Sequence, residues 1–213
     1  MNPKRVGRGS TPVTAELESA FLTYFEEIER CKKAQCYWSL LHLLVALPDV
    51  CSALETENGT ADGSGGLYRK WCKNYLDRDK PDKSFTPSDR YALRNVLLHQ
   101  GRTTTDQGQY RSYSFVQPTP AGEIVHKLID DFGPDGKNLT LDVSKIGDET
   151  VVAMGVWFTT LQKVEMQVAL ENVRRNIRWL ARQGQKHVPI PGSIITVSFP
   201  TTSSTGGFEK PAR

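Results

Sequence analysis

The sequence predicts a mainly α-helical fold, in the form of a bundle of four to five helices with a small antiparallel β-ribbon inserted before the last long helix. Apolar residues recur at three- and four-residue steps through most of the chain, which is the periodicity of helices with one buried face. Short alternating segments occur at about residues 110–145, where Pro and Gly separate them. We therefore expect one helical domain over residues 13–182, between a disordered basic arm (residues 1–12) and a mostly flexible tail (residues 183–213).

The first half of this domain is predicted to contain three helices. Residues 14–31 carry a single apolar stripe, which must pack against a partner. The next helix, over residues 35–47, is apolar nearly all round, so we expect it to lie centrally and to end at Pro48. A short helical turn and a Gly- and Ser-rich loop follow it, and helical periodicity resumes over residues 67–76.

A fourth helix, over residues 87–100, has the most sharply marked boundaries. Thr86 offers a hydroxyl cap, Pro87 suits the first helical position, and Asp89 places an acid in the first turn. Gly101 supplies a residue that can end the helix.

The rest of the domain is predicted to be a β-ribbon and one more helix. Alternation and neighbouring turn residues indicate short strands over residues 113–116, 123–128 and 139–143. Residues 148–182 then form one long helix with apolar positions spaced for burial.

Composition excludes several classes of protein. The net charge is +3 and the isoelectric point is about 8.6, so global electrostatics do not mark the chain as a nucleic-acid binder. The longest apolar stretch, residues 37–47, is well short of the ~20 residues that a membrane span needs. No apolar segment follows the basic N-terminus, as a secretion signal would require, so we expect a cytoplasmic protein with no membrane contact.

Four cysteines are scattered without the close spacing of zinc sites. We expect buried free thiols in preference to a metal site or disulfides, and we expect no metal and no cofactor. The scattered residues are Cys31, Cys36, Cys51 and Cys72.

The helix at residues 87–100 has two apolar faces. One arc of Leu and Val faces the core, while Tyr91 and Leu98 lie at the centre of the opposite arc. Arg94 flanks them on one side, and Asn95 and His99 flank them on the other. A second apolar face needs a second partner, so we expect a homodimer with Tyr91 and Leu98 in its interface. The alternative is that this face packs on the C-terminal helix of the same chain.

The flanking polar residues suit chemistry on phosphate esters. A His side chain titrates near neutral pH and can take a proton from a ribose 2′-hydroxyl or give one to a leaving 5′-oxygen. The planar guanidinium of Arg94 matches phosphate oxygens, and Asn95 could orient the ring of His99 or donate to the same phosphate. The spacing alone also occurs by chance in ordinary helices.

At the stretch LRNVLLHQG the chain resembles the HEPN superfamily. HEPN domains are helical, dimerise, and carry an Arg, usually followed by a polar residue, and then a His after four to six intervening residues. Arg94, Asn95 and His99 match this motif, with four residues between Arg94 and His99. The stretches LPDVCSALE and YRKWCKNYL also look like those of a branch of uncharacterised bacterial proteins with this helical core.

The resemblance implies metal-independent RNA cleavage, with Arg94, Asn95 and His99 of two subunits forming one site. Basic residues near the motif would then form an RNA-binding rim, although surface charge of this kind is often only solvated. These residues are Arg69, Lys70, Arg102 and Arg111.

We therefore expect a homodimeric endoribonuclease that acts on RNA, as a toxin or defence effector. Some HEPN-like domains are inactive, so the alternative is a non-catalytic scaffold that binds a nucleotide or a regulatory protein partner through the same cleft. A helical nucleic-acid binder without chemistry is a third hypothesis.

Overall fold

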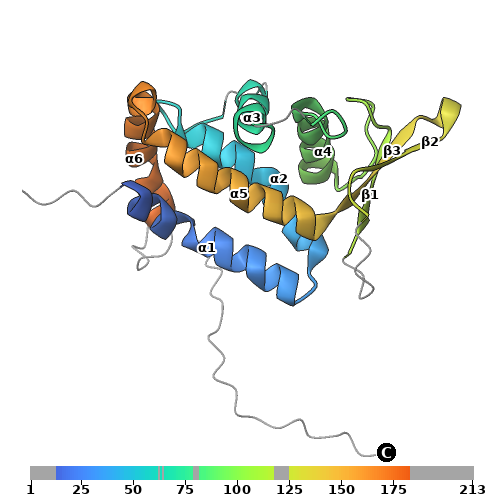
Figure 1. Cartoon of the computed structure of the whole chain (residues 1–213), viewed down its shortest axis with the longest axis horizontal. Coiled ribbons are helices and arrows are strands. Elements are labelled where there is room, and N and C mark those ends of the chain that lie inside the picture. The colour runs from blue at the N-terminus through green and yellow to red at the C-terminus, as the bar shows by residue number, and fades with distance from the viewer. Residues whose placement is uncertain (1–12, 62, 64, 79–81, 118–124, 183–213) are drawn as a thin grey trace, which may run out of the picture.

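The computed structural model describes residues 13–61, 63, 65–78, 82–117 and 125–182 of the chain. The predicted basic arm and the predicted tail lie outside these residues. The described part is mainly helical, with a small three-stranded sheet at one end of the helices (Figure 1). Its six α-helices are α1 (Val13–Lys33), α2 (Tyr37–Leu54), α3 (Gly66–Trp71), α4 (Pro87–Gln100), α5 (Val143–Leu161) and α6 (Gln167–Arg182).

Helix α2 is the centre of the fold and contacts each of the other five helices. By length and composition alone, α2 is long and apolar enough to cross a membrane. No other helix of the described residues meets these two criteria. Nine of its 18 residues are buried within the protein, as in the core helix of a soluble domain. The prediction that Pro48 ends it is wrong, because Pro48 lies buried inside the helix. The surrounding helices outweigh the local preference of proline for a helix end.

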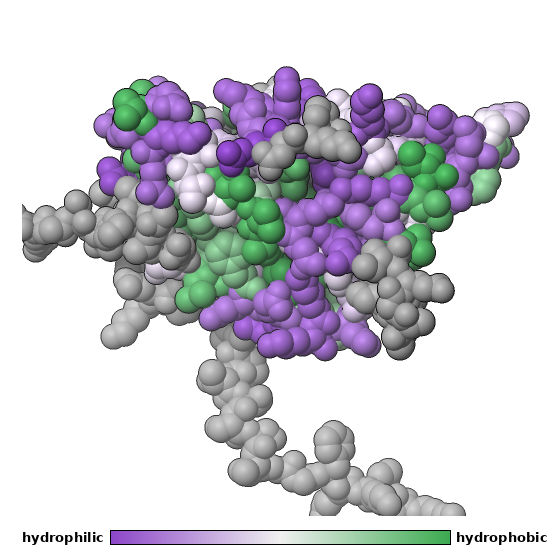
Figure 2. All heavy atoms as spheres, in the orientation of Figure 1, coloured by the Kyte–Doolittle hydropathy of each residue, from purple (hydrophilic) through white to green (hydrophobic). Residues whose placement is uncertain are grey.

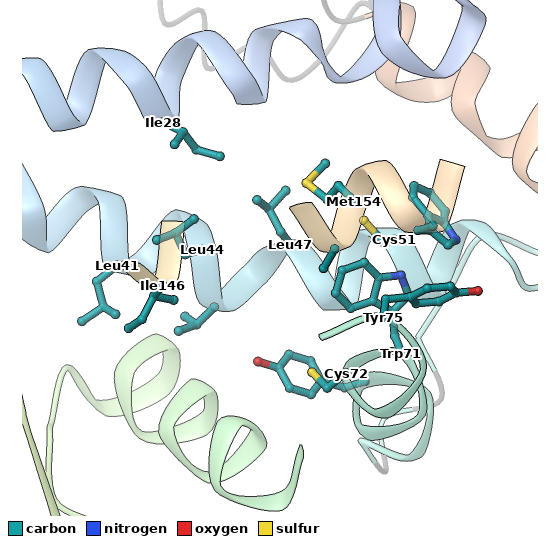
Figure 3. Close-up of a cluster of buried hydrophobic side chains, with 14 of the residues drawn as sticks. Ile28, Leu41, Leu44, Leu47, Cys51, Trp71, Cys72, Tyr75, Ile146 and Met154 are labelled. Carbon is teal, nitrogen blue, oxygen red and sulfur yellow. The ribbon is translucent and has the colours of Figure 1, made fainter. Parts of the chain in front are cut away.

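The core lies between α2 and the elements around it (Figure 3). Ile28 of α1, Leu44 and Leu47 of α2 and Met154 of α5 are buried there. Trp71 ends α3 and packs beside Trp157 of α5, with ring centroids 6.5 Å apart. A π-helical turn, Cys72–Leu76, continues α3. Among the four free cysteines, Cys36 is exposed, contrary to the prediction that all four are buried.

The sheet differs from the predicted antiparallel ribbon. Its strands are β1 (Ser112–Val116), β2 (Leu128–Asp131) and β3 (Lys137–Asp142), in the order β1-β3-β2. Strands β2 and β3 are antiparallel, but β1 and β3 are parallel. The alternation of residues within a strand is the same for both directions, so the sequence pattern could not distinguish them.

Two boundaries in the second half of the chain were also predicted wrongly. The strand expected at residues 123–128 is β2, which starts at Leu128; residues 123 and 124 lie outside the described residues. The single long helix is two helices, because α5 ends at Leu161 and Lys163 has an extended backbone before the 3₁₀ turn Val164–Met166. As a result, Val164 and Val168 are 84% and 75% exposed instead of buried.

The face of the molecule in Figure 2 is largely hydrophilic, with a hydrophobic patch over the middle of α5 and its border with α1. On α5, Val152 is 67% exposed, which also departs from the predicted burial. Helix α4 packs against α2 and α3 and lies between α3 and the sheet (Figure 1).

Candidate functional site

Helix α4 has the boundaries that its sequence predicts, Pro87–Gln100. The Thr86 side chain accepts a hydrogen bond from the backbone N–H of Asp89, and the Asp89 carboxylate accepts one from the Thr86 backbone N–H at 3.1 Å. These two bonds form a capping box. Gly101, with φ of 61°, ends the helix in the left-handed region. Local signals therefore fix the start and the end of the helix that carries the motif.

Asp89 also ties the loop after α4 back onto the helix. It is fully buried, and its carboxylate accepts hydrogen bonds from the backbone N–H of Gln109 at 2.7 Å and from the Gln109 side chain at 2.8 Å. Gly108 lies so close that a Cβ atom there would be 2.6 Å from Asp89 Oδ1. This anchor holds residues 107–109 beside α4, and Gln107 lines the cleft described next.

Arg94 is the centre of a hydrogen-bonded cluster on α4. Its Nη1 lies 3.0 Å from Asn95 Oδ1 and 2.9 Å from His99 Nε2. Its Nε donates to Asp49 Oδ2 of α2 at 2.6 Å. The Arg94 and Asp49 side chains are about one-fifth exposed, at 20% and 21%. The structure therefore brings the three predicted motif residues together and adds a fourth, Asp49.

These residues open onto a cleft of about 510 Å³. Its walls come from α2, α3 and α4 and from residues 61, 63, 65 and 107. The lining residues include Asp49, Gly63, Gly65, Tyr91, Arg94, Asn95, His99 and Gln107. The cleft can admit a phosphate group next to Arg94 and His99.

The second apolar face of α4 is partly covered within the chain. Tyr91 packs on Tyr68 of α3 with ring centroids 5.5 Å apart, and the Tyr91 ring lies against Gly65. Arg69 lies over the same ring, 4.8 Å from its centroid. Tyr91 and Leu98 are both partly buried against the core. The partner that covers Tyr91 is α3 and not the C-terminal helix that was the predicted alternative.

The predicted RNA-binding residues divide into two groups. Arg102 and Arg111 line a second cleft of about 360 Å³, which shares Asn95, Gln100 and Gln107 with the first. Arg111 also forms an ion pair with Asp106. Arg69 contacts the Tyr91 ring and Lys70 is exposed on α3, and neither residue lines the two clefts. The two clefts adjoin at the C-terminal end of α4 through these three shared residues, and we refer to them together as the groove at the end of α4.

A second polar cluster, which the sequence analysis did not single out, surrounds the buried Arg90 of α4. Its Nη2 lies 3.9 Å from Asp77, 3.7 Å from Asp82 and 3.7 Å from Glu149 of α5. Lys127 contacts Asp82 at 2.8 Å and Glu149 at 2.5 Å. His126 Nε2 lies 3.2 Å from Glu149 Oε1, and its Nδ1 accepts from the backbone N–H of Asp142 at 3.1 Å.

The carboxylates of this cluster differ in pKa. Burial raises the pKa of Asp77 to about 6, although the charge of Arg90 partly opposes this effect. Burial would also raise the pKa of Asp82, but hydrogen bonds from Lys127 and Ser84 lower it to about 2. Likewise, hydrogen bonds from His126 and Lys127 outweigh burial and lower the pKa of Glu149 to about 2. The cluster therefore links α4 and α5 to Asp77 and Asp82 by charge.

Both clusters contain residues that only the fold could identify. Asp49 was placed beyond the expected end of its helix at Pro48, so its contact with Arg94 was not predicted. Within the described part of the chain, no group of three or more His, Cys, Asp and Glu side chains is placed to hold a metal ion.

No protein-family model, curated protein or solved structure matches the chain. The case for its function therefore depends on the residues of the α4 cleft.

Proposed function

We propose that the chain is a metal-independent endoribonuclease of the HEPN superfamily that acts as a homodimer, as a toxin or defence effector. The observation that supports this proposal is the contact of Arg94 Nη1 with His99 Nε2 at 2.9 Å inside an open cleft. A phosphate-binding cation and a proton acceptor thus lie side by side, with the amide of Asn95 beside them.

Each residue has a role in the proposed cleavage. His99 takes the proton of a ribose 2′-hydroxyl while the 2′-oxygen attacks phosphorus. The bond from phosphorus to the 5′-oxygen breaks, a 2′,3′-cyclic phosphate forms, and the leaving 5′-oxygen takes up a proton. Arg94 stabilises the negative charge that builds on the phosphate oxygens, and the amide of Asn95 donates to the same group.

The need for a second copy follows from the proton count. Cleavage uses one group as a base and another as an acid, whereas His99 is the one histidine among the described residues that line the cleft. A twofold axis beside α4 would bring a second His99 to the site. Because Tyr91 and Leu98 are already partly buried, the partner would contact only their remaining exposed surface.

The groove at the end of α4 would hold the flanking RNA. Arg102 and Arg111 line the cleft that adjoins the site, so they would contact phosphates on one side of the cleaved bond. The cation of Arg111 would have to leave Asp106 to do so. We expect Arg69 and Lys70 to contribute least, because neither of them lines the two clefts.

The test is incubation of the pure protein with a mixed RNA pool in EDTA. We expect cleavage by the wild type, a loss of roughly 10²–10⁴-fold in rate for His99→Ala, and a loss of roughly 10²–10³-fold for Arg94→Ala. The matched controls are His42→Ala on α2 and Arg174→Ala on α6, which remove the same types of side chain from positions that do not line the cleft, and these variants should cleave normally. Intact RNA with the wild type, or equal cleavage by all variants, would refute the catalytic proposal.

Light scattering in the same buffer tests the second copy. A dimer that cleaves RNA supports the shared site. A monomer with full activity would show that one chain supplies both proton-transfer groups.

The second candidate is a non-catalytic scaffold that binds an anionic ligand or a regulatory protein partner in the same cleft. The observation that favours it is the Asp49 carboxylate at 2.6 Å from Arg94, which neutralises the cation that would bind the phosphate of RNA. This candidate predicts that Arg94→Ala weakens ligand binding while RNA stays intact with every variant.

A further inference from the structure

The contact between Arg94 and His99 determines where the His99 ring carries its proton. A guanidinium has only N–H donors and no acceptor, so His99 Nε2, 2.9 Å from Arg94 Nη1, must accept. Nε2 accepts only if it is unprotonated. The ring is therefore neutral in this arrangement, with its proton on Nδ1.

Asp49 fixes Arg94 in this position from a different helix. Its Oδ2 accepts from Arg94 Nε at 2.6 Å, while Asn95 Oδ1 accepts from Nη1 at 3.0 Å. The guanidinium is planar, so holding Nε and Nη1 at once also fixes the direction of its remaining N–H groups. Asp49 thus acts on His99 through Arg94, as a positioning residue.

We propose that Arg94, positioned by Asp49, is a latch on His99 Nε2 that a bound phosphate oxyanion opens. This inference rests on the proposed function, since Nε2 is the atom that would take the 2′-hydroxyl proton. An anionic oxygen accepts a stronger hydrogen bond from a guanidinium than a neutral imidazole nitrogen does. A phosphate in the cleft therefore draws Nη1 away from His99 and leaves the lone pair on Nε2 free. The base becomes available only when the phosphate group is present.

Replacement of Asp49 separates positioning from simple structural support. In Asp49→Asn the ion pair with Arg94 is lost, so the guanidinium is no longer held in one orientation toward His99. The His99 ring then samples both tautomers. The same variant binds inorganic phosphate more tightly, because the competing carboxylate is gone. Asp49→Glu keeps the charge and should restore the tautomer of the wild type in part.

The experiment is ¹⁵N NMR of the full chain with labelled histidine, at about pH 8, where histidine is ordinarily neutral. The protein contains two internal controls. His42 Nδ1 lies 2.8 Å from the Trp38 carbonyl oxygen, so its proton is on Nδ1; His126 Nδ1 accepts from Asp142, so its proton is on Nε2. A His99→Gln variant assigns the His99 signal.

We expect His99 to carry its proton on Nδ1 in the free protein. Inorganic phosphate should then shift the His99 Nε2 signal, leave His42 and His126 unchanged, and have no such effect in Arg94→Ala. A proton on Nε2 in the free protein would overturn the latch. So would an unchanged His99 signal when phosphate binds, or an equal shift in Arg94→Ala. No RNA is used, so these outcomes are independent of whether the protein cleaves it.

Discussion

The buried carboxyl group of Asp77 should make the stability of the protein depend on pH in a direction unusual for an acid. Its side chain is only 5% exposed, its Oδ1 has no hydrogen-bond partner, and it lies 3.9 Å from Arg90 Nη2. Burial of this kind disfavours the charged form, which raises the pKa of Asp77 to about 6. Asp77→Asn removes the charge and keeps the shape of the side chain.

The size and the sign follow from the two pKa values. The pKa of Asp is about 3.9 in the unfolded chain, so the difference from about 6 corresponds to about 3 kcal/mol. Because the folded state holds the proton more tightly, this contribution to the free energy of unfolding is fully present below about pH 4. It is lost as the pH rises through about 6. The free energy of unfolding of Asp77→Asn, compared with that of the wild type, should therefore rise by about 2 kcal/mol between pH 4 and pH 7.

Urea denaturation of both proteins between pH 3 and pH 8 measures this difference. Asp82→Asn is the matched control, since hydrogen bonds from Lys127 and Ser84 lower the pKa of Asp82 to about 2, despite burial. That variant should be less stable than the wild type at pH 7, and the deficit should disappear as the pH falls from about 4 to about 2. A stability difference between Asp77→Asn and the wild type that is the same at pH 4 and pH 7 would show that the Asp77 carboxyl is not destabilised by burial.

Two further substitutions test the packing around the cleft. Gly65 has φ of 73°, and a Cβ atom there would lie 2.1 Å from Tyr91 Cζ, whereas Gly63 has φ of 67° and nothing within 4 Å. In urea denaturation, Gly65→Ala should therefore cost about 2–4 kcal/mol and Gly63→Ala about 1 kcal/mol, and equal losses would contradict the close approach of Gly65 to Tyr91. The Asn176 side chain of α6 donates to the Leu54 and Thr56 carbonyl oxygens at 3.1 and 2.8 Å. Thermal denaturation should show a loss of about 1–3 kcal/mol for Asn176→Ala and almost none for the exposed Arg174→Ala, and a negligible loss for the first would show that water replaces these bonds.

Local signals predicted the elements of the fold better than their arrangement. The boundaries of α4 were predictable because Thr86, Pro87 and Gly101 act on their own helix end. Pro48 was misleading, since its effect depends on the five helices that surround α2. The parallel pairing of β1 with β3 depends on which strand occupies the centre of the sheet, and residue alternation does not specify that.

The candidate site, like the fold, was predictable only in part. The sequence placed Arg94 on one side of Tyr91 and Leu98, and Asn95 and His99 on the other, so a twofold axis was expected to bring them together. The hydrogen-bond contact of Arg94 with His99 within one chain was therefore not predicted. Asp49 is 45 residues away in sequence and was not predicted. The cluster around Arg90 likewise joins segments that are distant along the chain. Contacts of this kind follow from packing, which a single sequence does not reveal.

The ends of the cleaved RNA test the central proposal most directly. After incubation of a short oligoribonucleotide in EDTA, mass spectrometry of the fragments should find a 2′,3′-cyclic phosphate on one product and a 5′-hydroxyl on the other. Both products should be lost with His99→Ala and kept with His42→Ala. Uncut RNA, or the same products from His99→Ala, would contradict the assignment of the α4 cleft as a ribonuclease site.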